Sequence, residues 1–197
     1  MINRLRKSLS GVFKYSDSEE YSRRYAVMNA FDGVITILGI ILGSVLLGGA
    51  ATKQIAAAGI GAAIAMGISG VSGTYMTEMA EQERRIKEIE EAMLVKLEGS
   101  VIVKARREAA IIAAIVDSLS AILAGLIVLF PYFASVLGYL TANAAFYLSM
   151  FISFGLLFSL GVFLGKVAKE NIIISGIKSL AIGLATLLLI TLLNLAL

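Results

Sequence analysis

Five apolar stretches, each about 20 residues long, restrict the fold of this chain more than any other feature. A helix needs about 20 apolar residues to cross the hydrocarbon core of a bilayer, which is about 30 Å thick. A soluble domain could not bury all of them, because 58% of the 197 residues are hydrophobic and only 16% are charged. The sequence therefore predicts an all-α membrane protein with five transmembrane helices. The expected spans are residues 26–47, 57–80, 109–130, 144–165 and 172–195.

The basic residues predict how these spans are oriented. Of the 17 lysines and arginines, all except Lys53 precede the first span, separate the second from the third, or lie near the turn between the fourth and fifth. Cytoplasmic loops are enriched in lysine and arginine, so we expect the N-terminus in the cytoplasm and the C-terminus outside. This asymmetry requires an odd number of spans. We expect an integral protein of the plasma membrane of a prokaryote.

The expected organisation is a cytoplasmic N-terminal segment, residues 1–25, followed by a membrane domain over residues 26–197. The one sizeable polar stretch inside that domain is residues 81–108. The apolar residues Ile86, Ile89, Met93 and Leu97 recur there at helical spacing, which predicts a short cytoplasmic amphipathic helix.

Helix breakers are scarce along the chain. None precedes Gly99 in the polar stretch, so we expect the second span to continue into it as one long helix. The single proline, Pro131, is expected to end a helix. It is flanked by Phe130, Tyr132 and Phe133, which are typical of an aromatic belt at the membrane interface.

The chain contains no cysteine, histidine or tryptophan. Thiolate and imidazole metal sites, haem ligation, cysteine nucleophiles and histidine-based triads are thereby excluded. Any metal site must use carboxylates, carbonyl oxygens or methionine sulfur. We expect no enzyme activity and no prosthetic group, because no nucleophile–base pair or cofactor motif is present. The net charge of +3 reflects membrane orientation, and we expect no nucleic-acid partner.

Two aspartates fall inside predicted spans. Asp32 and Asp117 each lie about two turns from the cytoplasmic end of their span. A carboxylate at this depth costs about 2.5–3.5 kcal/mol on insertion scales, which is typical of an ion path, a proton relay or a structural pair. The alternatives are an interfacial pair of Asp32 with Arg23 or Arg24, and for Asp117 a hydrogen-bonded tie between helices through serine or asparagine.

The second span and its polar continuation hold further candidate ligands. Methionine sulfur and a series of glutamates at helical spacings could gather Fe²⁺, Mn²⁺ or Ca²⁺ on one face. The alternative is a solvated helix with i,i+4 ion pairs such as Glu83–Lys87. The candidate metal ligands are Asp32, Met76, Glu78, Met79, Glu81, Glu88, Glu91 and Asp117, with Glu98 further along the same series.

Several weak motifs occur in a fixed order along most of the chain. They are the Asp32-Gly33 pair, the small-residue stretch 69–77, the stretch 124–132 that ends in Pro-Tyr, and the glycine-containing stretches 161–165 and 175–183. Together they resemble the vacuolar iron transporter family. The short polar stretch is similar to the reduced linker of the divergent branch of that family.

The resemblance implies a homodimer that exports Fe²⁺ or Mn²⁺ from the cytosol against protons, with Asp32 lining the path. The family's second-helix glutamate stands at Thr74 here, and Glu78, one turn further along, is the candidate substitute. Membrane lipid, the divalent metal ion and a second copy are the expected partners. Two other functions stay open: a non-transporting scaffold that holds a cytoplasmic partner through residues 81–108, and a lipid-interacting protein of the same fold.

Overall fold

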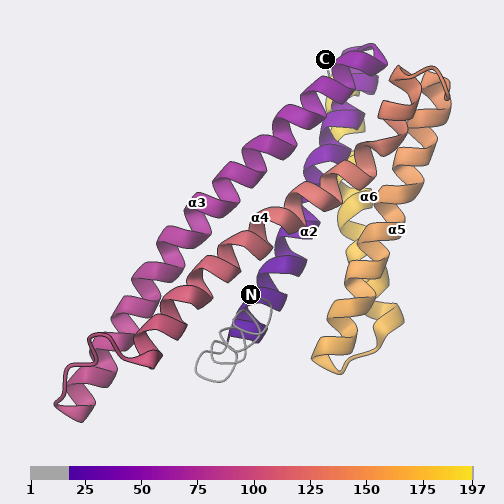
Figure 1. Cartoon of the computed structure of the whole chain (residues 1–197). Helices are drawn as coiled ribbons and strands as arrows, with labels where there is room; N and C mark the ends of the chain where they lie inside the picture. Colours follow the sequence, from indigo (N-terminus) through magenta and orange to yellow (C-terminus); the bar gives the residue numbers. More distant parts are fainter. Residues whose placement is uncertain (1–17, 197) are drawn as a thin grey trace. The chain divides into compact units, whose positions relative to one another are not determined.

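The chain is all-helical over the residues that the structure describes. The structure is a computed structural model that describes residues 18–196, with side chains from residue 22. Five of its helices are long and apolar enough to cross a membrane, which confirms the predicted fold class. In chain order the elements are α2 (Ser18–Leu42), the π-helix η1 (Gly43–Leu47), α3 (Thr52–Met93), α4 (Val101–Val136), α5 (Ala142–Ala168) and α6 (Ile172–Ala196) (Figure 1).

Helix α3 is much longer than a bilayer crossing requires. Its 42 residues correspond to about 63 Å of helix, and all its charged residues except Lys53 lie in its second half. The second span therefore continues without a break into the polar stretch, as predicted. The helix ends at Met93, several residues before the expected breaker at Gly99, because Leu94 adopts a left-handed conformation with φ of 52°.

The expected single amphipathic helix over residues 81–108 is instead the end of α3, a connection and the start of α4. The side chain of Glu90 accepts a 2.7 Å hydrogen bond from the Leu97 N–H and so ties the connection back to α3. Ser100 then caps α4, since its hydroxyl accepts from the Val103 N–H at 3.3 Å. The left-handed Leu94 and the Ser100 cap therefore divide residues 81–108 between two helices. Neither feature can be recognised from the spacing of apolar residues.

Two other expected boundaries also differ. Helix α2 begins at Ser18, inside the segment 1–25 that was expected to precede the membrane domain, and the basic residues Arg4 to Lys14 lie outside the described residues. Pro131 lies inside α4, which continues to Val136, so the prediction that it ends a helix is wrong. Membrane helices tolerate proline where neighbouring groups satisfy the freed backbone, and the next residue, Tyr132, is fully buried.

The chain divides into two compact units, and each is described by itself. The first comprises residues 1–26 and 68–119, of which the structure describes residues 18–26 and 68–119. The α3 and α4 parts of this unit run antiparallel (Figure 1). Within the α4 part, the partly buried Ile112 packs against the buried Ala105 and Ala109 in a small core. Small side chains of this kind let membrane helices approach closely.

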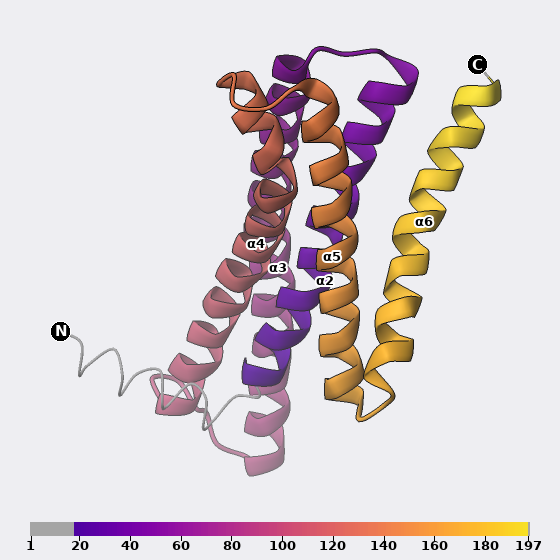
Figure 2. The same cartoon turned by 90° about the vertical axis from the view of Figure 1, so that its right-hand side faces the viewer.

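The second unit comprises residues 27–67 and 120–197 and holds the larger apolar core. Gly33 of α2 packs directly on the backbone of Ala121, where a β-carbon would overlap the carbonyl oxygen. Helices α5 and α6 run antiparallel and side by side in both views (Figures 1 and 2), and Gly176 leaves room for the ring of Phe158. The residues at the centre of the core are Val34, Ile37, Ile41, Ile55, Val128, Leu129, Tyr132 and Leu157.

Candidate functional site

A row of residues spaced by four lies on one face of α3 within the first unit. The row consists of Gly70, Thr74, Glu78 and Gln82, and its three side chains make hydrogen bonds. A spacing of four keeps side chains on the same side of a helix. We refer to these four residues as the α3 polar row. Glu78 and Gln82 are buried, with 6% and 2% of their surface exposed.

Asp117 of α4 contacts the first two members of the row. Its Oδ2 accepts a 2.9 Å hydrogen bond from the Thr74 hydroxyl, and the residue is 2% exposed. Gly70 makes this approach possible, because a β-carbon there would lie 2.8 Å from Asp117 Oδ2 and 3.2 Å from Ser118 Cα. A hydrogen-bonded tie between helices was one of the two expectations for Asp117, although the donor is a threonine in place of the expected serine or asparagine.

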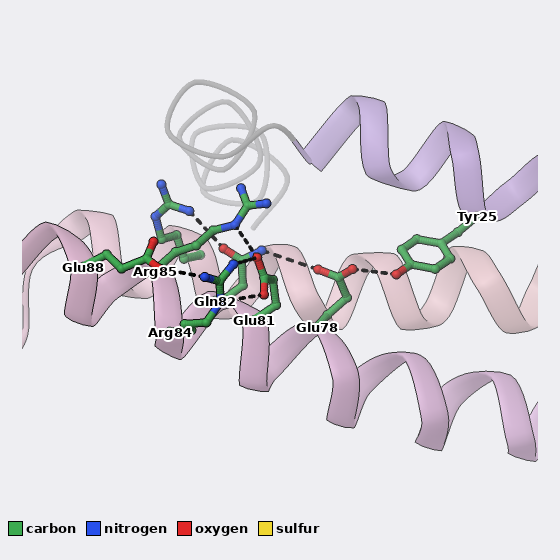
Figure 3. Close-up of polar contacts among 8 residues, drawn as sticks. Tyr25, Glu78, Glu81, Gln82, Arg84, Arg85 and Glu88 are labelled. Carbon is green, nitrogen blue, oxygen red and sulfur yellow. Dashed lines mark hydrogen bonds and ion pairs between the residues drawn. The ribbon is translucent and has the colours of Figure 1, made fainter.

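Glu78 is the second buried carboxylate of the site. Its Oε1 accepts a 2.6 Å hydrogen bond from the Tyr25 hydroxyl of α2, and its Oε2 accepts a longer one of 3.4 Å from the Gln82 amide (Figure 3). Both donors are neutral. Hydrogen bonds of this kind satisfy the oxygen atoms of a buried carboxyl group, which would otherwise carry a large desolvation cost.

Gln82 connects Glu78 to the cation Arg106 of α4. While its amide nitrogen donates to Glu78, its Oε1 accepts a 3.1 Å hydrogen bond from Arg106 Nη1. The two bonds determine which end of the amide is the oxygen. Among the described residues, the Arg106 guanidinium therefore hydrogen bonds to Gln82, and the neutral Gln82 amide, in turn, hydrogen bonds to Glu78.

Glu81 and Glu88, which follow Glu78 on α3, accept hydrogen bonds from arginines. Glu81 accepts hydrogen bonds from Arg84 at 2.8 and 3.0 Å and from Arg85 at 2.9 Å, and Arg84 also binds Glu88 at 2.7 Å (Figure 3). These pairs are at least partly exposed, so solvent screens them and they contribute little to stability. The predicted i,i+4 pairing is thus present, although with different partners.

The remaining acidic residues do not form one ligand face. Glu83 lies 3.8 Å from Arg107 across the α3–α4 connection, in place of the expected pairing with Lys87. Glu91 is exposed at the end of α3, and Glu98 lies beyond that end. Among residues 18–196, no group of three acidic side chains is close enough to hold a metal ion.

The other predicted ligands are dispersed. Met76 is 70% exposed and Met79 is half-buried, so neither belongs to the polar row. Asp32 is exposed on α2 in the second unit. Of the eight candidates, Glu78 and Asp117 are the two that the structure places along one packed helix face. Asp117 meets α3 at Thr74, which lies one turn, or about 6 Å along the helix axis, before Glu78.

Four residues of the site were missed by sequence reasoning: Tyr25, Thr74 as a donor, Gln82 and Arg106. One signal was available, because polar residues at spacing four from Thr74 to Gln82 continue the line begun by Gly70. The donors from α2 and α4 left no such signal, since their sequence positions do not show which face of α3 they meet.

Comparisons with known proteins identify a family. Residues 10–197 match the model of the Major Facilitator Superfamily. The uncharacterized protein MJ0645 of the archaeon Methanocaldococcus jannaschii is 34% identical over 189 residues, which cover 94% of this chain and 95% of that protein. These matches support a membrane transporter family but not the vacuolar iron transporter family specifically, and the metal substrate stays a prediction. With five membrane-crossing helices and a match over nearly its whole length, the chain belongs to the Major Facilitator Superfamily and is a membrane transporter.

Proposed function

We propose that this transporter exports a divalent transition-metal ion, Fe²⁺ or Mn²⁺, from the cytosol in exchange for protons. The observation that supports this function is the pair of buried carboxylates, Glu78 and Asp117, along one helix interface. Ionisable groups inside membrane-spanning helices are costly and are typical of ion paths and proton relays. Both residues are almost completely buried, and both accept hydrogen bonds from neutral hydroxyl groups.

The neutral donors suit an exchange of cation for proton. Carboxylate, hydroxyl and amide oxygens are the ligand types that hard divalent ions prefer. Among the described residues, the hydrogen-bond partners of Glu78 are neutral, so an incoming cation would not have to displace an arginine there. Glu81, in contrast, is bound by two arginines and is the weaker candidate ligand.

Thr74 explains how the site can lack the glutamate that the resemblance implies. Thr74 donates a hydrogen bond to Asp117, so the carboxylate beside position 74 comes from α4 and not from α3. A glutamate at position 74 would place a second carboxylate beside the buried Asp117. We therefore place the metal site beside position 74, where the resemblance implies a glutamate, and assign the carboxylate ligand to Asp117 of α4.

We also propose a homodimer with its N-terminus in the cytoplasm of a prokaryotic cell. Gly39, Gly43 and Gly73 have no atoms within 4 Å of the position a β-carbon would take, so a second copy could approach closely there. Asp32 is exposed in the single chain and would be covered by such a partner. Gly33 and Gly70, in contrast, are used for packing within the chain.

Transport by purified protein in proteoliposomes tests the proposal. With Mn²⁺ or Fe²⁺ on one side and a pH gradient across the membrane, wild-type protein should move metal and protons in opposite directions. Glu78→Gln, Asp117→Asn and Asp32→Ala should each reduce the metal flux at least tenfold without loss of membrane insertion. Glu98→Gln removes an exposed carboxylate beyond the end of α3 and is the matched control. Wild-type flux in all three variants would refute the site.

Transport measured with a panel of cations tests the identity of the ion separately from the location of its binding site. If Ca²⁺ or a monovalent ion moves through the wild-type protein while Mn²⁺ and Fe²⁺ do not, the transition-metal assignment is wrong and the carboxylate site stands. Absence of transport with every ion would favour the scaffold or lipid-interacting alternatives.

A further inference from the structure

Arg106 of α4 is a half-buried cation without an anionic partner among the residues that the structure describes. Its Nη1 donates a 3.1 Å hydrogen bond to the amide oxygen of Gln82, and its Nε is buried without a hydrogen-bond partner. Burying a charge is costly, and a neutral amide oxygen offsets less of that cost than a carboxylate would. The fold thus keeps a positive charge where it is unfavourable for stability.

The other arginines with described side chains on α3 and α4 are paired with glutamates. Arg84 and Arg85 both bind Glu81, as Figure 3 shows. Arg107, which follows Arg106 directly, lies 3.8 Å from a glutamate of α3. Arg106 is therefore the exception among them, and its charge is not neutralised within the described part of the chain.

Gln82 places this charge beside the proposed metal ligand Glu78. The amide oxygen of Gln82 accepts from Arg106, while its nitrogen donates to Glu78 Oε2 at 3.4 Å. One amide group therefore separates the guanidinium from the carboxylate. Gln82 and Glu78 are both buried, so water screens the interaction between the two charges only weakly.

A positive charge at this position acts differently on the empty site and on the occupied one. It attracts the free carboxylate of Glu78, but it repels a cation bound there, and the repulsion grows with the charge of the ion. The affinity for a divalent ion is therefore lower than the carboxylate alone would give. A transport site must bind its ion strongly enough to admit it and weakly enough to release it.

We propose that the unpaired charge of Arg106 sets the affinity of the Glu78 site for a divalent ion and speeds the release of that ion. This inference rests on the proposed function, because it assigns Arg106 a role toward the transported metal. In the described structure Arg106 hydrogen bonds to Gln82 and not to Glu78, so it acts on the ion through its electric field across the amide.

Three substitutions of Arg106 separate its charge from its hydrogen bond. Arg106→Lys keeps the charge, Arg106→Gln removes it but retains a donor for Gln82, and Arg106→Met removes both. Calorimetric titration of the full chain in phosphatidylcholine nanodiscs should show that the glutamine and methionine variants bind Mn²⁺ about tenfold more tightly than the wild type. The lysine variant should restore the wild-type affinity.

Transport kinetics in proteoliposomes provide a second measurement. In the glutamine and methionine variants the KM for Mn²⁺ should fall, and kcat should fall with it because the ion is released more slowly. Arg107→Gln is the matched control, since Glu83 already neutralises that charge and both side chains are exposed. Its affinity for Mn²⁺ should stay within about twofold of the wild type, because solvent screens an exposed pair.

The possible outcomes distinguish this inference from the proposed function. Suppose that Glu78→Gln abolishes Mn²⁺ binding while the glutamine and methionine variants of Arg106 bind as the wild type does. The role of the charge is then wrong, and the metal site stands. Weaker binding by the methionine variant would show that Arg106 orients Gln82 and would also overturn the role of the charge. Absence of Mn²⁺ binding by the wild-type protein would refute the proposed function and this inference together.

Discussion

The Thr74 hydroxyl donates a 2.9 Å hydrogen bond to Oδ2 of the buried Asp117, which joins α3 to α4 inside the first unit. Gly70, one turn earlier on α3, leaves the space that the carboxylate occupies. A carboxylate, its donor and the glycine that admits it therefore form one arrangement, and each of the three can be tested separately.

Replacing Thr74 by valine keeps the shape of the side chain and removes the donor. We expect Thr74→Val to destabilise the folded protein by about 1 kcal/mol, the typical value of a hydrogen bond between membrane helices. Thermal unfolding in detergent measures this loss. Thr74→Ser retains the hydroxyl and should stay close to wild type, so equal stability of the valine and serine variants would show that the bond contributes nothing.

A β-carbon at position 70 should push the Asp117 carboxylate away from Thr74. Gly70→Ala is therefore expected to lower both the melting temperature and the metal flux. Gly61→Ala is the control on the same helix, because no atom lies within 4 Å of its β-carbon position. Alanine also has the higher helix propensity, so Gly61→Ala should be neutral or slightly stabilising. Identical behaviour of the two variants would contradict the close contact at Gly70.

The Tyr25–Glu78 hydrogen bond should be measurable as a coupling between two substitutions. Tyr25→Phe and Glu78→Gln each remove part of a 2.6 Å contact. We expect the double variant to be less destabilised than the sum of the single ones, with a coupling of about 1–2 kcal/mol. Chemical unfolding of the four proteins measures the coupling. Strict additivity would mean that the two groups do not interact in the membrane.

Dimerisation should depend on glycines that no atom of the same chain approaches, such as Gly39, and not on glycines that pack within the chain, such as Gly33. Gly39→Leu is expected to shift the protein toward monomer while each chain stays folded. Gly33→Leu should instead unfold the second unit, because that side chain would meet the backbone of Ala121. Mass measurements in lipid nanodiscs distinguish the two results. A functional wild-type monomer in nanodiscs would refute the dimer.

Orientation can be tested by labelling single cysteines in intact cells with a membrane-impermeant maleimide. We expect labelling at Lys53→Cys, which lies at the start of α3, and protection at Lys87→Cys, which lies near its other end. The reason is the concentration of basic residues on the side of Lys87. The opposite pattern would place the N-terminus outside.

The five spans, and the unbroken run of α3 from its apolar first half into the charged second half, were predictable because hydropathy and helical spacing act locally along the chain. The pairing of Glu81 with Arg84 and Arg85 is equally local, since these residues are three and four positions apart. Pro131 and the end of α3 at Met93 were not predictable in this way. A proline within a helix depends on its neighbours, and the left-handed Leu94 has no marker in the pattern.

In the candidate site, too, some features of single residues could be predicted from the sequence and others depend on how the helices pack. Insertion cost alone marked Asp117 as a residue that needs a partner, yet only the packing of α4 on Gly70 showed that the partner is Thr74. Glu78 was a candidate from its spacing, but its burial depends on Tyr25 and Gln82, which are separated from it by 53 and 4 positions along the chain. A contact across 53 residues leaves no trace in periodicity, because it is set by how whole helix faces pack and by which polar groups that packing removes from water or lipid.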